Sequence, residues 1–120
     1  MPKQITKQSK KYDIFFRIRI FDDSGHFVGK GRIELLENIG KFGSITRAAA
    51  EMKMSYRQAW QMVEDMNEIT ASLLVEKILG GKGGGGAKLT VKGEKVIKVF
   101  HQIEDDLEHF SRQLAKKIKF

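Results

Sequence analysis

The sequence predicts a mainly α-helical domain with a small amount of β-structure: a winged helix-turn-helix with an N-terminal β-hairpin and a long C-terminal helix. Three observations predict this fold. Two short helical patterns joined by a few residues lie at 43–67. A stretch holding six of the chain's twelve glycines follows at 79–90, between two strand-like segments. Residues 90–120 then repeat apolar side chains at helical spacing.

Length and charge limit the classes of protein to consider. The chain has 120 residues, enough for one domain with a single core. Its 22 Lys and Arg against 15 Asp and Glu give a net charge of +7, which favours a polyanionic partner such as nucleic acid or an acidic membrane surface. The plain alternative is that the charge only confers solubility. Cysteine is absent, which excludes disulfides and thiol chemistry, and no signal peptide or membrane-length apolar run occurs, so a cytoplasmic protein is expected.

The N-terminal part divides into an arm and a hairpin. Residues 1–11 are polar and basic and are expected to form a flexible arm, and 12–120 a single winged-helix domain. Residues 12–21 alternate between two faces with the period of a strand. The faces are Ile14, Phe16, Ile18 and Ile20, and Phe15, Arg17, Arg19 and Phe21. "DDSG" at 22–25 predicts a turn, and 26–29 a short partner strand.

Three helices are predicted next: one over 32–42, a short one capped by Ser44, and one from Tyr56 to about Ile69, capped by Ser55. The inner faces are Ile33, Leu36 and Ile39 or Gly40; then Ile45, Ala48, Ala49 and Met52; then Ala59, Met62 or Val63, Met66 and Ile69. The triple alanine allows the last two helices to approach closely. Such a pair is typical of a helix-turn-helix, and an ordinary helical hairpin is the alternative.

The exposed residues at the start of the third helix suggest a function. They are Tyr56, Arg57, Gln58, Trp60 and Gln61. These donors, acceptors and aromatic rings differ from the Glu/Lys mixture of an ordinary solvated face, and a recognition helix presents such side chains to base edges. Trp60 lies at the boundary of the inner face, so it either packs against the core or contacts DNA directly.

The glycine-rich stretch is interpreted as the tip of a hairpin. Residues 72–79 and 87–91 are plausible strands on either side of it. A flexible hairpin directly after a helix-turn-helix is the wing of a winged helix. Lys82 is placed to reach phosphates, and the neighbouring glycines, Gly83 and Gly84 among them, allow close approach to the DNA backbone or entry into the minor groove.

Two competing interpretations carry less weight. The run "GKGGGG" at 81–86 matches the dinucleotide-binding pattern, with Asp105 and Asp106 beyond it. That site requires the glycines to open a helix, whereas a strand-like segment follows here. His101, Asp105 and His109 share a helix face, which makes a metal conceivable, but a solvated helix face is the simpler explanation. Neither a cofactor nor a metal nor an enzyme activity is therefore expected.

The C-terminal segment predicts one long helix over 92–119, about 42 Å in length, capped by Thr90. Its apolar positions step by three and four: Val96, Phe100, Ile103, Leu107, Phe110, Leu114 and Ile118. This stripe is longer than a small winged helix can cover. We therefore expect dimerisation through the six positions from Val96 to Leu114, the alternative being that the stripe packs within its own domain.

Several motifs together resemble a known family. They are "GSITRAAAEMKMSYRQAW", "MVEDMN", "LLVEK" and "GGKGGGGAKLTVKG". Residues from about Gly31 to Phe100 resemble the N-terminal DNA-binding domain of the molybdate-dependent regulator (ModE) family, a relative of LysR-type winged helices. The resemblance implies a cytoplasmic, dimeric regulator that binds an operator. Members of full length carry C-terminal oxyanion-binding domains, which are absent from this stand-alone form, so molybdate binding is not expected.

The predicted function is thus sequence-specific binding of double-stranded DNA by a homodimeric transcriptional regulator. The residues expected to read or clamp the major groove are Ser55, Tyr56, Arg57, Gln58 and Gln61, with Trp60 beside them. Ser44 and Arg47 are expected to hold the DNA backbone, and Lys82 with its glycines to make the wing contact. The alternative from another class is a protein-interaction module that uses the long C-terminal helix and has no role on DNA.

Overall fold

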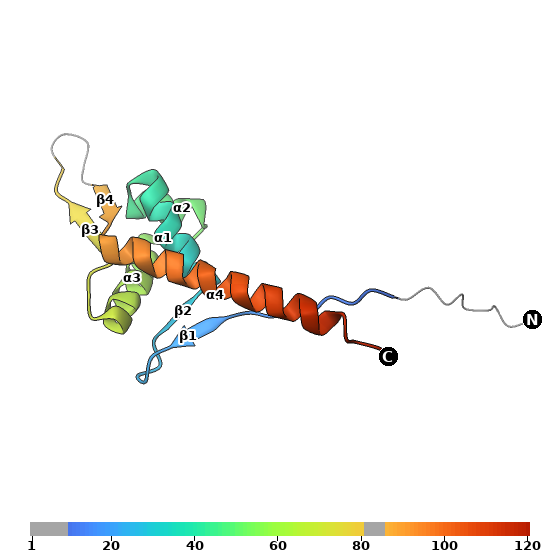
Figure 1. Ribbon diagram of the computed structural model, residues 1–120. Coiled ribbons are helices and arrows are strands. Elements are labelled where there is room, and N and C mark those ends of the chain that lie inside the picture. Colours follow the sequence, from blue (N-terminus) through green and yellow to red (C-terminus); the bar gives the residue numbers. More distant parts are fainter. Residues whose placement is uncertain (1–9, 81–85) are drawn as a thin grey trace, which may run out of the picture.

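The computed structural model describes residues 10–80 and 86–120 (Figure 1). Within them, four helices and two antiparallel hairpins follow one another along the chain. The elements are β1 (Arg19–Phe21), β2 (Phe27–Gly29), α1 (Lys30–Phe42), α2 (Ile45–Glu51), α3 (Tyr56–Thr70), β3 (Val75–Ile78), β4 (Gly86–Leu89) and α4 (Val91–Ala115). The expected mainly helical chain with two small hairpins and a long C-terminal helix is confirmed. The 1–11 arm lies largely outside the described residues.

Helix α1 forms the centre of the core. Its residues Ile33, Leu35, Leu36 and Ile39 are at most 1% exposed, and α2, α3, β4 and α4 all pack around it. Helix α1 begins two residues earlier than predicted, and Ile39, not Gly40, is the residue that faces the core. The buried alanines of α2 and α3 bring these two helices against α1 and each other, as expected from residues without bulk.

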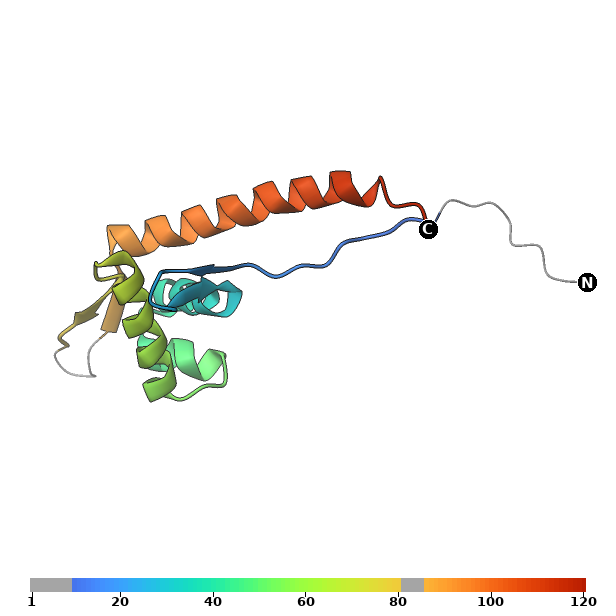
Figure 2. The ribbon, with the colours of Figure 1, turned by 90° about the horizontal axis from the view of Figure 1, so that it is seen from below.

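The N-terminal strand is much shorter than the predicted 12–21. Only Arg19–Phe21 pairs, with Phe27–Gly29 opposite, because α1 starts at Lys30 and leaves no partner for the residues before Arg19. The segment 10–18 is extended without a ladder and follows the outer part of α4 (Figure 2). Beyond the end of α4, the ring of Phe120 lies 5.2 Å from that of Tyr12 in this segment.

The second hairpin is also displaced from the predicted strands 72–79 and 87–91. Residue Ala71 ends α3 in the left-handed conformation, and the side chain of Asn67 accepts a hydrogen bond from the Leu74 amide at 2.9 Å. Residues 71–74 therefore form a turn, not a strand. At the other side, Thr90 caps α4: its hydroxyl accepts from the Gly93 amide at 3.0 Å and donates to the Leu73 carbonyl at 2.7 Å.

Helix α4 runs from Val91 to Ala115, four residues shorter at its C-terminal end than the predicted 92–119, because a turn begins at Lys116. Its first half lies across the helical body, and its second half projects beyond it (Figures 1 and 2). Among the residues that the structure describes, no helix combines the length and hydrophobicity that a bilayer crossing requires.

Candidate nucleic-acid interface

Helices α2 and α3 are held as a pair by two local caps. The Ser44 hydroxyl accepts a hydrogen bond from the Arg47 amide at 3.2 Å, and the Ser55 hydroxyl accepts one from the Gln58 amide at 3.0 Å. Both caps are those predicted. The connection between the helices is tight because Lys53 adopts a left-handed conformation with φ of 56° and the Met54 amide donates back to Ala49 at 3.0 Å.

The solvent-facing side of α3 changes charge along its length. In the first two turns Arg57, Gln58 and Gln61 are exposed, whereas Glu64 and Glu68 are exposed further on. No ion pair joins Arg57 to another residue in the described ranges. A polyanion is therefore attracted to the N-terminal end of α3 and repelled by its C-terminal half.

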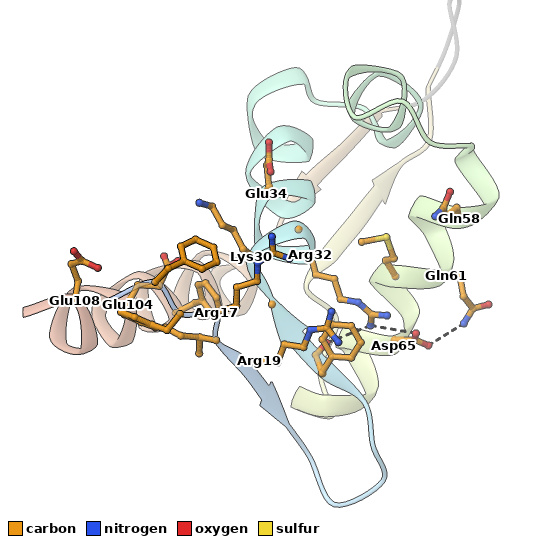
Figure 3. A pocket seen from close by; sticks show the side chains of 18 of the residues that line it. Arg17, Arg19, Lys30, Arg32, Glu34, Gln58, Gln61, Asp65, Glu104 and Glu108 are labelled. Carbon is orange, nitrogen blue, oxygen red and sulfur yellow. Dashed lines mark hydrogen bonds and ion pairs between the residues drawn. The ribbon is translucent and has the colours of Figure 1, made fainter. Parts of the chain in front are cut away.

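One flank of α3 borders an open groove of about 1380 Å³ between the 14–19 segment, α1, α3 and α4 (Figure 3). Charged residues of both signs line it: Arg17, Arg19, Lys30, Arg32 and Arg57, and Glu34, Asp65, Glu104, Asp105 and Glu108. Arg32 is held by Asp65 at 3.3 Å and by the ring of Phe27 at 4.0 Å, and Asp65 also accepts from Gln61 at 3.0 Å. Gln58 and Gln61 of α3 border the groove as well, so the residues predicted to contact DNA share this surface of mixed charge with carboxylates.

The other flank of α3 faces the foot of the β3–β4 hairpin. Trp60 is partly buried and packs against the core, in agreement with the boundary position expected for it; its contact with DNA stays a prediction. The ammonium of Lys77, from β3, lies 4.1 Å from the centre of the Trp60 ring and 5.9 Å from that of Tyr56. Lys77 was not predicted as a site residue, since only folding brings it to Trp60.

Of the remaining predicted residues, Ser55 borders the open groove, and Ser44 and Tyr56 lie on this second flank. Ser44 and Tyr56, together with Lys77, border a hollow of about 430 Å³ between the starts of α2 and α3 and the hairpin. Arg47 is exposed, with its guanidinium 5.2 Å from the ring of Phe42. Lys82, Gly83 and Gly84 lie outside the described residues, so their contact with DNA as part of a wing stays a prediction.

The two competing interpretations meet unfavourable geometry. Strand β4, not a helix, begins at the end of the glycine run, and Asp105 and Asp106 lie within α4, whereas a dinucleotide site needs a helix at the glycines. On α4, His101 is shared between Glu104 at 2.8 Å and Glu37 at 3.3 Å. Within the described ranges, no three His, Cys, Asp or Glu side chains are grouped to hold a metal ion.

The apolar stripe of α4 divides into two parts. Val96 and Ile103 are partly buried and Phe100 is 2% exposed, so the core of the same chain already covers this part. The other members are more open: Leu107 is 40%, Phe110 55% and Leu114 38% exposed. A surface for a second chain is thus narrower than predicted, because the side chain of Phe100 has almost no area left for a partner.

The sequence is similar to curated regulatory and binding proteins. It is 44% identical over 85 residues to the molybdenum-pterin-binding protein MopB of Rhodobacter capsulatus and 40% identical over 83 residues to the transcriptional regulator ModE of Haemophilus influenzae. It is 42% identical over 74 residues to the DNA-binding transcriptional dual regulator ModE of Escherichia coli K12. These three names are those of regulators or binding proteins, not of enzymes. No family model matches the chain.

The alignments cover most of this chain but a minor part of each relative. They span 62–71% of the chain and 28–32% of the relatives, within the N-terminal region of those proteins. The chain therefore spans about a third of the length of the curated relatives it matches. The resemblance seen in the motifs is confirmed by this homology.

Proposed function

We propose that the chain is a winged helix-turn-helix protein that binds double-stranded DNA and regulates transcription, because it is 40% and 42% identical to two ModE transcriptional regulators over 69% and 62% of its length. The observation that carries this proposal is the capped α2–α3 pair, with Arg57, Gln58 and Gln61 exposed at the N-terminal end of α3. This is the end from which recognition helices of helix-turn-helix proteins contact bases.

The parts take the following roles. The start of α3, from Ser55 and Tyr56 onward, enters the major groove, where Arg57 pairs with a guanine and the two glutamines with neighbouring base edges. Ser44 and Arg47, at the start of α2, hold a phosphate. The β3–β4 hairpin is the wing, with Lys82, Gly83 and Gly84 against the DNA backbone or in the minor groove.

Two copies of the chain pair through the outer part of α4. Leu107, Phe110 and Leu114 lie on one face at helical spacing and are at least 38% exposed, so a second copy of the same surface buries all of them. A dimer presents two copies of α3 to two half-sites, which raises the affinity for a palindromic operator by linking the two binding events.

The test is binding to duplex DNA selected from genomic fragments, measured by fluorescence anisotropy. Arg57→Ala is expected to weaken specific binding by about 1–3 kcal/mol and to relax preference at one base position. Glu68→Gln, on the acidic half of the same face, is the matched control and is expected to leave the preference intact. Lys82→Ala is expected to weaken all sequences alike and to reduce the salt slope by about 1. Unchanged binding in both Arg57→Ala and Lys82→Ala contradicts these contacts.

A protein-interaction module without a role on DNA is the second candidate, favoured by the exposed apolar face of α4. The two candidates differ in one measurement. A DNA-binding regulator shifts random duplex in a gel at low salt, because the phosphate contacts are independent of sequence. A chain that fails to do so, while its α4 still associates, supports the interaction module.

We also propose that this chain binds DNA without molybdate. One relative is named a molybdenum-pterin-binding protein, but the chain aligns with only 32% of its length. That this chain does not bind molybdate therefore stays a prediction. Calorimetry with molybdate, followed by anisotropy with and without it at constant ionic strength, is the measurement. Micromolar molybdate binding that changes the affinity for DNA contradicts the prediction.

A further inference from the structure

We propose that Lys77 binds a phosphodiester of the DNA backbone in the hollow between α2, α3 and the β3–β4 hairpin, and that Trp60 positions the Lys77 ammonium instead of contacting bases. The inference rests on the proposed function and adds to it one phosphate contact and one positioning residue. The juxtaposition that carries it is the Lys77 ammonium 4.1 Å from the centre of the Trp60 ring.

Lys77 comes from the part of the hairpin that is tied to the body. Its strand partner is Ala87, which is 2% exposed, and the Ala87 amide donates to the carbonyl of Gly43 at 2.9 Å, at the end of α1. Gly86 lies so close to this carbonyl that a Cβ there would approach its oxygen to 2.8 Å. The foot of the hairpin is therefore anchored by backbone contact, and the position of Lys77 does not depend on the glycine tip.

The surroundings of Lys77 are suited to an anion. Among the residues that the structure describes, the polar side chains that border the hollow are Ser44, Thr46, Tyr56 and Lys77, and no carboxylate does so. The nearest acidic residue along the strand, Glu76, alternates to the opposite face and pairs there with Lys88 at 3.8 Å. Within the described residues, no carboxylate forms an ion pair with Lys77, so its charge is free for a ligand.

Trp60 restricts where that charge can be. The ring is packed against the core, and a cation is attracted to the face of an indole. The flexible side chain of Lys77 thus loses part of its freedom before any ligand arrives, which lowers the entropic cost of binding. An ammonium has three N–H donors, so it can rest on the ring and still donate to a phosphate oxygen on its other side.

The location is consistent with a DNA backbone between the two predicted contact elements. The hollow lies beside Tyr56, at the start of α3, and at the foot of the hairpin proposed as the wing. A duplex that places α3 in its major groove has a phosphate strand running between helix and wing, and a lysine at that point contributes to affinity without reading sequence.

The experiment compares salt dependence in variants of the full chain on one duplex. Lys77→Met keeps the length of the side chain and removes the charge; it is expected to weaken binding to all sequences by about fivefold near physiological salt and to reduce the salt slope by about 1. Lys88→Met, on the opposite face of the same hairpin, is the control and is expected to keep the wild-type slope.

Trp60 is tested by a pair of substitutions. Trp60→Leu leaves the charge of Lys77 but removes the ring, so affinity is expected to fall about twofold to fivefold while the salt slope stays near that of wild type. Trp60→Phe retains an aromatic face and is expected to restore most of the affinity. Circular dichroism and thermal unfolding establish that each variant is folded.

Because Trp60 is the single tryptophan of the chain, its fluorescence provides an independent measurement. Binding of a phosphate to the ammonium above its ring is expected to change the emission of Trp60 on DNA addition, and Lys77→Met to diminish the change. A wild type that binds DNA while Lys77→Met keeps both the slope and the emission change overturns this inference alone. A wild type that binds no duplex overturns the proposed function, and this inference with it.

Discussion

The two halves of α4 follow the same apolar spacing but have different surroundings. In the first half, Gly93, Val96 and Phe100 face α1 and the turn before β3, and Phe100 is 2% exposed. In the second half, Leu107 and Phe110 continue the stripe beyond the body and are 40% and 55% exposed (Figure 2). One apolar stripe along α4 therefore has two different surroundings. Its first half completes the core of the chain, and we propose that its second half packs against a second copy.

The difference teaches that spacing alone does not say what covers a helix face. The helical body lies against the first half and ends near the level of His101, whose imidazole reaches Glu37 of α1 at 3.3 Å. Beyond it only the extended 10–18 segment follows α4 among the described residues (Figure 2), and Ser111 is buried while Leu107, Phe110 and Leu114 stay exposed. The following substitutions act on one half or on the boundary between them.

The largest effect is expected from Phe100→Ala in the first half. Removal of this buried ring leaves a cavity and is expected to lower the free energy of unfolding by about 3–5 kcal/mol. Chemical denaturation monitored by Trp60 fluorescence measures it. Phe110→Ala, in the second half, is the matched control and is expected to change the unfolding of a single chain by less than about 0.5 kcal/mol.

Gly93→Ala is expected to destabilise the first half through backbone contact. A Cβ at this position overlaps the carbonyl oxygen of Leu74, which also accepts from the Thr90 amide at 3.0 Å, so the α4 start and the turn must separate. A loss of about 1–3 kcal/mol is expected in thermal or chemical unfolding. Gly31→Ala, in α1, meets no atom within 4 Å and is expected to be neutral or stabilising. Equal behaviour of the two variants contradicts the close approach.

Substitutions in the second half are expected to affect assembly and not folding. Leu107→Lys combined with Phe110→Lys places two charges on the exposed apolar face, which disfavours pairing; sedimentation is expected to show a monomer where wild type is a dimer. The combination of His109→Lys with Gln113→Lys adds charges to the same segment at positions outside the apolar stripe and is expected to remain dimeric. A wild type that is monomeric at micromolar concentration refutes the assignment.

The smallest effect concerns the boundary. The His101 imidazole donates hydrogen bonds to the carboxylates of Glu104 and Glu37, and these bonds and the negative charges raise the pKa of His101 above its ordinary value, against the lowering caused by partial burial. The protonated form of His101 is thus favoured in the folded chain, and its contacts contribute to the free energy of unfolding. This contribution is fully present below about pH 6.5 and is lost as pH rises through the raised pKa of His101. The side chains are largely exposed, which limits it to a few tenths of a kcal/mol.

Unfolding measured across this pH range tests the link. His101→Gln is expected to remove this pH dependence of stability, whereas His109→Gln is expected to keep it, because the hydrogen bond of His109 within the described residues is to Gln113 on its own helix. High salt is expected to diminish the dependence in wild type. A pH profile that is unchanged in His101→Gln shows that the contact does not join α4 to α1 energetically.

Local features of the fold were predictable, whereas strand lengths were not. Caps at Ser44, Ser55 and Thr90 depend on a side chain three residues from its partner, so the sequence shows them directly. The strand predicted over 12–21 shortened to Arg19–Phe21 because ladder length depends on the partner segment as well as on the alternation. The exposed residues of α3 were predicted from its period, but their contacts with DNA remain predictions.

By itself, the sequence determined which segments are helical, which faces of α1, α2 and α3 turn inward, and where the helices capped by Ser44, Ser55 and Thr90 begin, because periodicity and capping act over a few residues. Only the tertiary structure decided how far the body extends along α4 and that Lys77 meets the ring of Trp60 at 4.1 Å. These outcomes depend on the packing of segments that are far apart in the chain, and a local sequence pattern does not predict the distance between such segments.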